Sequence, residues 1–192
     1  MKSHKIDILD KSKELFQRFG YQKTTLTDIA KSVGKVKTAV YYYFSGKEEI
    51  FAALIQSEAE DFLIKLKKEV ALEKDATKKL EKYVAARIQL MQKVATKYNF
   101  LKKEFFELMP LVEVNRANSF QEEIKWVEEL MIENNKKGLM ITELPTFSSV
   151  MLVQSLKGLE IQMYVTDQLI VEKDNLQSFI NYILYGVLQK SK

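Results

Sequence analysis

The 192-residue sequence contains no cysteine, one histidine, two prolines and six glycines. Without cysteine the chain can form neither disulfide bonds nor a thiolate metal site. With His4 as the sole histidine, His/Cys zinc sites and catalysis by Cys-His or Ser-His-Asp groups are also excluded. So few glycines and prolines in a chain of this length favour an all-α protein over one that is rich in hairpins.

The sequence also lacks long apolar runs and phosphate-binding loops. No run approaches the roughly 18 residues of a membrane-spanning helix, and Lys2, Lys5 and Asp7 indicate an amphipathic first helix where a signal peptide would be apolar. No glycine-rich phosphate loop occurs. Neighbouring carboxylates such as Glu122 and Glu123 diverge around a helix, so we interpret them as solvated. We predict a cytoplasmic protein that is not an enzyme and holds neither metal nor cofactor.

The positive charge is unevenly distributed along the chain. Residues 1–50 contain 10 Lys and Arg against 6 Asp and Glu, which leaves 20 residues of each sign in the remainder. The whole net charge of +4 therefore falls within the first quarter of the chain. Such an asymmetry is expected of a segment that gains affinity by displacing counterions from nucleic-acid phosphates.

The stretch from Thr24 to Phe44 has the pattern of two short helices joined by a tight turn. Thr27 is placed to cap the first helix, and Gly34 suits the left-handed position that ends it. The second helix, about Lys37 to Phe44, buries Val40 and Phe44 on one side. A helix-turn-helix is the interpretation that this pattern favours.

The other side of this second helix carries lysine, threonine and tyrosine. Lysine and tyrosine hydroxyls can bind phosphate oxygens, and a threonine methyl or tyrosine edge can contact bases in the major groove. Ordinary amphipathic packing of the tyrosines is the alternative. Before the first helix, the Thr25 hydroxyl could hold a phosphate or simply cap the helix.

Residues 15–50 carry a series of motifs in a fixed order. They are LFQRFGY (Leu15–Tyr21), Thr24-Thr25, IAKSVG (Ile29–Gly34), YYYF (Tyr41–Phe44) and KEEI (Lys47–Ile50). In order and spacing the segment from about Ile6 to Ile50 resembles the N-terminal domain of the tetracycline-repressor (TetR) family of transcriptional regulators. It departs from the family pattern at Val36, where serine is usual, and at Thr38 and Ala39, where glycine and threonine are common.

This resemblance implies an all-α chain with an N-terminal three-helix helix-turn-helix domain (residues 1–46) and a larger helical ligand-binding and dimerisation domain (residues 47–192). It implies a homodimeric repressor that binds a near-palindromic double-stranded operator and is released by a small, largely apolar ligand. Lys35, Lys37, Tyr42 and Lys47 are expected mainly at phosphates, Thr38, Ala39 and Tyr41 close to bases, and Thr25, Thr27 and Tyr43 complete the predicted DNA-binding residues.

Helical periodicity predicts further helices over about Thr77–Thr96, Val112–Lys137, Pro145–Val165 and Asp174–Gln189, with Pro110 interrupting the path and Gly138 ending the longest. The last two helices are apolar enough to be either internal core or half of a four-helix bundle. The resemblance favours the bundle as a dimer interface that contains Leu156, Gly158, Leu159, Ile180, Ile183, Leu184 and Val187.

The middle helices carry many methionine and aromatic side chains, which line either an ordinary core or an adaptable ligand cavity. The candidate pocket residues are Phe62, Met91, Phe105, Phe106, Met109, Trp126, Met131 and Met163. No buried charge is evident, so Tyr83, Tyr98 and Gln162 are the expected polar contacts. Two other readings remain: a DNA-binding regulator controlled by a protein partner, and a helical protein with no DNA role.

Overall fold

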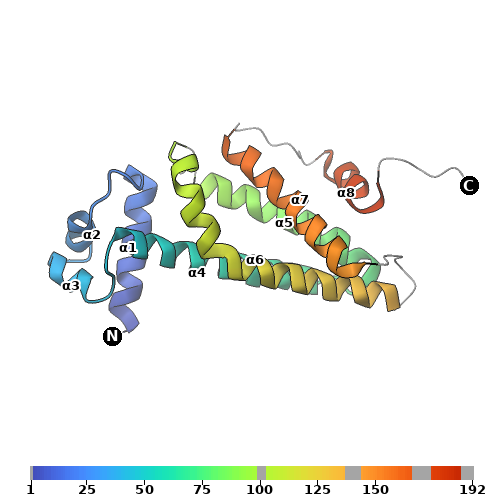
Figure 1. Cartoon of the computed structure of the whole chain (residues 1–192), viewed down its shortest axis with the longest axis horizontal. Helices are drawn as coiled ribbons and strands as arrows, with labels where there is room; N and C mark the ends of the chain where they lie inside the picture. Colours follow the sequence, from blue (N-terminus) through green and yellow to red (C-terminus); the bar gives the residue numbers. More distant parts are fainter. Residues whose placement is uncertain (1, 99–102, 137–143, 166–173, 187–192) are drawn as a thin grey trace, which may run out of the picture. The chain divides into compact units, whose positions relative to one another are not determined.

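The computed structural model describes residues 2–98, 103–136, 144–165 and 174–186, and these ranges form helices and no strand (Figure 1). The all-α prediction is therefore confirmed. None of the helices in these ranges is long and apolar enough to cross a membrane. The helices are α1 (Lys2–Phe19), α2 (Leu26–Ser32), α3 (Lys37–Tyr41), α4 (Lys47–Ala71), α5 (Ala76–Lys97), α6 (Phe105–Lys136), α7 (Pro145–Val165) and α8 (Leu176–Tyr185).

The chain divides into two compact units. Unit 1 comprises residues 1–61 and 96–119, and unit 2 comprises residues 62–95 and 120–192. Both α4 and α6 continue from one unit into the other. Unit 1 also includes residues 47–61 of α4. The domain boundary that we expected near residue 46 stays a prediction.

Unit 1 contains α1, α2 and α3, which lie together as a three-helix head (Figure 1). Its centre is an aromatic cluster in which the rings of Phe16, Tyr21 and Phe51 lie 4.8–5.7 Å apart between centroids. Each is almost fully buried, and burial of a large apolar side chain contributes about 1.5–3 kcal/mol. Gly20 follows α1 at φ +86°, the left-handed conformation that a glycine adopts at little cost just after a helix.

Unit 2 is built around one continuous hydrophobic core. Side chains from α4, α5, α6, α7 and α8 contribute to it, so helices that are far apart in the sequence share one interior. The fully buried side chains at its centre are Leu66, Val70, Tyr83, Val84, Val127, Val153 and Leu156.

Two predicted helix boundaries in the second half of the chain are wrong. Pro110 lies inside α6, which starts at Phe105 instead of near Val112. A proline removes one backbone hydrogen bond, and the other bonds of this 32-residue helix outweigh that loss. The last helix ends at Tyr185, because Gly186 adopts φ +84° and leaves the helix instead of lying within it. The predicted role of Gly138 falls outside the described residues.

Candidate nucleic-acid interface

The N-terminus of α2 is capped by Thr25, so the prediction that Thr27 caps it is wrong. The Thr25 hydroxyl accepts a hydrogen bond from the Asp28 backbone N–H at 3.2 Å, and the Asp28 carboxylate accepts one from the Thr25 N–H at 3.0 Å. This reciprocal arrangement is a capping box, which satisfies two backbone donors that the helix leaves open. The Thr25 hydroxyl also donates to the Asp28 carboxylate at 2.6 Å, and this bond, followed by the one from the Thr25 backbone N–H, lowers the pKa of Asp28.

The turn between α2 and α3 has a fixed geometry. Gly34 adopts φ +66°, the Lys35 N–H donates to the Ala30 carbonyl at 2.9 Å, and the Gly34 N–H donates to the Lys31 carbonyl at 3.1 Å. This pair of bonds defines a Schellman motif, in which glycine adopts the left-handed conformation at little cost. The predicted role of Gly34 is confirmed, and the motif determines where α3 begins.

Helix α3 is shorter than predicted, because it ends at Tyr41 and the chain turns before Phe44. Its inner side is nevertheless as predicted: Val40 and Phe44 are 0% and 1% exposed. The Val36 residue that precedes α3 has extended backbone and provides no side-chain cap. A short helix of this kind is held in place by its buried residues, since five residues form too few hydrogen bonds to be stable alone.

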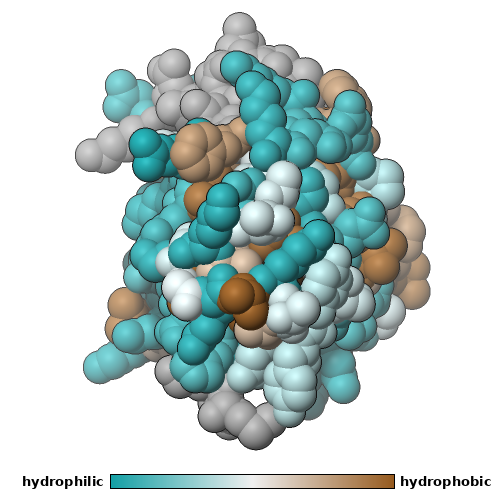
Figure 2. Space-filling view, turned by 90° about the vertical axis from the view of Figure 1, so that its left-hand side faces the viewer, coloured by the Kyte–Doolittle hydropathy of each residue, from teal (hydrophilic) through white to brown (hydrophobic). Residues whose placement is uncertain are grey.

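The outer side of α3 exposes most of the predicted DNA-contacting side chains. Tyr42 is 70% and Tyr41 is 47% exposed, and Lys35, Lys37 and Thr38 are exposed as well. The Lys37 ammonium lies 5.6 Å from the centre of the Tyr41 ring. Figure 2, which shows the left-hand side of Figure 1, is mainly in hydrophilic colours with hydrophobic spots among them. Lysine and tyrosine on such a surface are suited to phosphates and base edges.

Thr25 and Thr27 are exposed too, but three of the predicted DNA-binding residues are less available. Ala39 and Tyr43 are half-buried, and the Tyr43 ring packs edge-on against Tyr42 with 5.0 Å between centroids. Lys47, which we expected at a phosphate, donates to the backbone carbonyl of Tyr21 at 2.8 Å and sits 4.2 Å from the Tyr21 ring centre. Burial lowers the pKa of Lys47, while the charges of Glu104 and Glu48 act in the opposite direction.

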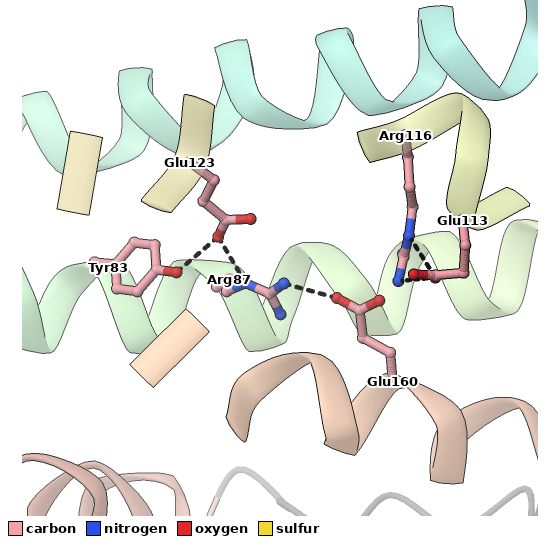
Figure 3. A network of polar contacts seen from close by, with 6 residues as sticks. All are labelled: Tyr83, Arg87, Glu113, Arg116, Glu123 and Glu160. Atoms are coloured by element: carbon pink, nitrogen blue, oxygen red, sulfur yellow. Dashed lines mark hydrogen bonds and ion pairs between the residues drawn. The ribbon is translucent and has the colours of Figure 1, made fainter. Parts of the chain in front are cut away.

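Unit 2 contains a buried polar network that no pattern in the sequence indicates (Figure 3). Arg87 of α5 donates from Nε to Glu123 of α6 at 2.7 Å and from Nη2 to Glu160 of α7 at 2.8 Å. The Tyr83 hydroxyl donates to the same Glu123 oxygen at 2.7 Å. All four side chains are buried, so the interpretation of Glu123 as solvated is wrong, and so is the expectation of no buried charge.

Burial and charge act differently on the members of this network. Burial raises the pKa of the Tyr83 hydroxyl well above its ordinary value, and the charge of Glu123 raises it further. For Arg87, burial alone would lower the pKa, but the two carboxylates outweigh burial and raise it. Arg87 is therefore a permanent cation, and Tyr83 remains a neutral hydrogen-bond donor at physiological pH.

The predicted pocket residues occupy three kinds of position. Met91, Phe105 and Met131 are buried, Phe62, Met109 and Trp126 are half-buried, and Phe106 is 77% exposed. The side chain of Met163 lies outside the described residues. Tyr83, one of the expected polar contacts, bonds to Glu123. The pocket stays a prediction.

The predicted dimer residues also differ in exposure. Leu156 and Ile180 are buried within unit 2 itself, Leu159, Ile183 and Leu184 are half-buried, and Gly158 is exposed, while Val187 lies outside the described residues. A Cβ added at Gly158 would meet no atom within 4 Å. The dimer interface stays a prediction as well.

A comparison with known families identifies the head. Residues 8–54 match the family model of bacterial regulatory proteins of the tetR family. Among curated proteins, the chain is 37% identical over 62 residues to an uncharacterized HTH-type transcriptional regulator, YfiR, of Bacillus subtilis. It is 42% identical over 50 residues to IcaR of Staphylococcus epidermidis, a negative regulator of a biofilm operon. These matches cover 32% and 26% of this chain and only 30% and 27% of the relatives.

Solved structures match over nearly the whole chain. The fatty acid degradation regulator FadR of Bacillus halodurans has a TM-score of 0.73 and 20% identity, covering 94% of both chains. A TetR/AcrR-family regulator of Thermobifida fusca has a TM-score of 0.73 and 21% identity, covering 97% of this chain and all of its own. These similarities extend the common fold into unit 2. The N-terminal segment thus matches the tetR family model over residues 8–54, and the chain as a whole shares the fold of these solved structures.

Proposed function

We propose that the chain is a homodimeric repressor that binds a near-palindromic operator through α3 and is released by a small, largely apolar ligand. The observation that carries this proposal is the head itself. A capping box and a Schellman motif fix α2 and α3, and the side of α3 that faces away from the core exposes lysine, threonine and tyrosine. Fixed geometry and an exposed polar surface are the two requirements of a helix that enters the major groove.

Within this proposal, Lys35, Lys37 and Tyr42 bind mainly phosphates, while Thr38, Ala39 and Tyr41 approach base edges. Two heads in a dimer would read half-sites separated by about one helical turn, roughly 34–36 Å, or slightly more. Repression is supported by the relative IcaR, which is named as a negative regulator. A cytoplasmic location follows from this role.

The proposed ligand belongs to unit 2, whose core combines large apolar side chains with the Tyr83–Arg87–Glu123–Glu160 network. A structural neighbour of the same fold, FadR of Bacillus subtilis, was solved in complex with stearoyl-CoA; it has a TM-score of 0.68 and is 17% identical over 95% of this chain. Long-chain acyl-CoA thioesters are therefore the first compounds to screen. Release from DNA would reflect a coupling free energy of about 1–3 kcal/mol between the two sites.

Fluorescence anisotropy tests the proposal with labelled duplexes from the DNA that flanks this protein's own gene, across a series of salt concentrations. We expect tight binding to one duplex, a steep loss of affinity with salt, and loss of that binding in Tyr42→Ala. Stearoyl-CoA is then added to the complex as the first ligand probe. Equal and weak binding to every duplex at low salt would contradict the proposed function.

A further inference from the structure

The turn between α1 and α2, residues 20–22, is held on its carbonyl side by Lys47. The Lys47 ammonium donates to the Tyr21 carbonyl at 2.8 Å and to the Gln22 carbonyl at 3.4 Å. The Tyr21 ring, which is packed against Phe16 and Phe51, lies beneath the same ammonium. The first residue of α4 therefore binds the turn in three ways.

The N–H side of the same turn is held by Glu104, which immediately precedes α6. One carboxylate oxygen accepts the Tyr21 N–H at 2.9 Å and the other accepts the Gln22 N–H at 3.0 Å. The backbone carbonyl of Glu104 accepts the Leu108 N–H at 3.0 Å, so this residue also starts the hydrogen bonding of α6. Hydrogen bonds to a charged acceptor are roughly twice as strong as those between neutral groups.

Gly20 makes the approach of this carboxylate possible. Its φ of +86° favours glycine, and a Cβ at this position would lie 3.1 Å from the nearer Glu104 carboxylate oxygen. Any larger residue would push against the carboxylate that holds the next two N–H groups. The sequence from Gly20 to Gln22 is thus fitted to an acidic side chain that lies more than 80 residues further along the chain.

We propose that Glu104 is a positioning residue for DNA binding, which fixes the head to the start of α6 through the backbone of Tyr21 and Gln22; this rests on the proposed function. The physical reason is entropic. A head that is already held in place loses less freedom when it binds DNA than a head that moves. Because α6 continues from this contact to Glu123 in the buried network, one helix carries both contacts.

Two full-length variants with the same change of charge test the proposal. Glu104→Gln replaces one acceptor oxygen with an NH₂ group that faces a backbone N–H, whereas Glu107→Gln alters only a bond to the Gln22 side chain. By NMR, amide hydrogen exchange at Tyr21 and Gln22 should become at least about tenfold faster in Glu104→Gln and stay near the native rate in Glu107→Gln. This measurement needs no DNA, so it is independent of the proposed function.

DNA affinity is then measured on a duplex that the native protein selects from a random-sequence pool. We expect Glu104→Gln to bind about tenfold more weakly, Glu104→Asp to recover part of the loss, and Glu107→Gln to remain within about twofold of native. Native-like affinity of Glu104→Gln, or equal losses in both glutamine variants, would overturn the proposal. If Glu104→Gln does not fold, Glu104→Asp takes its place. Faster amide exchange at Tyr21 and Gln22 together with weaker DNA binding than native would support the proposal, and native exchange rates with native affinity would refute it. If the native protein selects no duplex, the proposed function fails, and the exchange rates alone decide whether the contact exists.

Lys47 provides a second test, because a phosphate contact and a positioning contact differ in their salt dependence. Losing a phosphate contact makes the slope of log affinity against log salt shallower by about 1. We expect this change for Lys37→Met, whereas Lys47→Met should lower affinity with the slope unchanged. A shallower slope in Lys47→Met would place this ammonium at a phosphate and remove it from the turn's support.

Discussion

The head and unit 2 use charged and polar side chains in opposite ways. On the head, Lys35, Lys37 and Tyr42 are exposed. In unit 2, Arg87, Glu123 and Glu160 are buried and bond to one another. A polar group directed to an external partner must stay hydrated until that partner arrives, whereas a buried one must be satisfied within the fold. Exposure thus distinguishes the groups that we propose to contact DNA from the groups that hold the structure.

The largest effect should come from breaking the buried network with Arg87→Met. Two carboxylates and the Tyr83 hydroxyl would then stay buried without their cation, a change that costs about 3–5 kcal/mol. Urea unfolding at one fixed protein concentration measures this loss. Arg116→Met is the control, because Arg116 pairs with Glu113 three residues away on the same helix at a partly exposed position (Figure 3). It should cost no more than about 1 kcal/mol. A similar cost in both variants would remove the distinction between buried and exposed pairs.

Tyr42→Ala in the head should have the opposite effect, because it should weaken DNA binding and leave stability nearly unchanged. This side chain is 70% exposed, so its removal should leave the unfolding temperature nearly unchanged while specific DNA affinity falls by about tenfold or more. Leu72→Ala changes an equally exposed residue that directly follows α4, and it should alter neither quantity. A drop in stability without a drop in affinity would assign Tyr42 to packing.

Glu58 is partly buried, so its exposure is intermediate between that of the Arg87 network and that of Tyr42. It should make the stability of the fold depend on pH. Burial alone would raise the pKa of Glu58, but hydrogen bonds from Lys13 and Lys97 lower it from 4.5 to about 2. A carboxylate with a depressed folded-state pKa stabilises the fold above pH 4.5, and the contribution is lost as the pH falls towards 2. Glu58→Gln should therefore be about 1–2 kcal/mol less stable at pH 7 and as stable as the native protein near pH 2. A constant difference at all pH values would contradict this.

The smallest effect should distinguish the two threonines at the start of α2. Thr25→Ala removes the capping box and should cost about 1 kcal/mol, whereas Thr27→Ala should be nearly neutral. Thermal unfolding of the two variants and the native protein measures the difference. If Thr27→Ala proved the more costly, the cap would be at the position that the sequence pattern suggested.

The sequence alone determined features that depend on neighbours along the chain. The all-α class, the ends of α7, the left-handed Gly34 and the inward side of α3 all follow from local periodicity and from the conformational freedom of glycine. The TetR motifs in the head belong to the same group, because they lie within residues 8–54. Even here, only the structure distinguishes Thr25 from Thr27 as the cap, since both lie close to the start of the helical pattern.

Only the tertiary structure decided the contacts between distant residues. In the sequence, Glu123 resembles the many glutamates that are expected to be solvated. In the structure it is buried, where Arg87 and Tyr83 of α5 donate hydrogen bonds to it. Glu104 has no local feature that marks it, yet its carboxylate binds two backbone N–H groups of a turn in the head. Helical periodicity reports which side of a helix is apolar. It does not report which charged residue on one helix will face a partner on another, because that depends on how the helices pack.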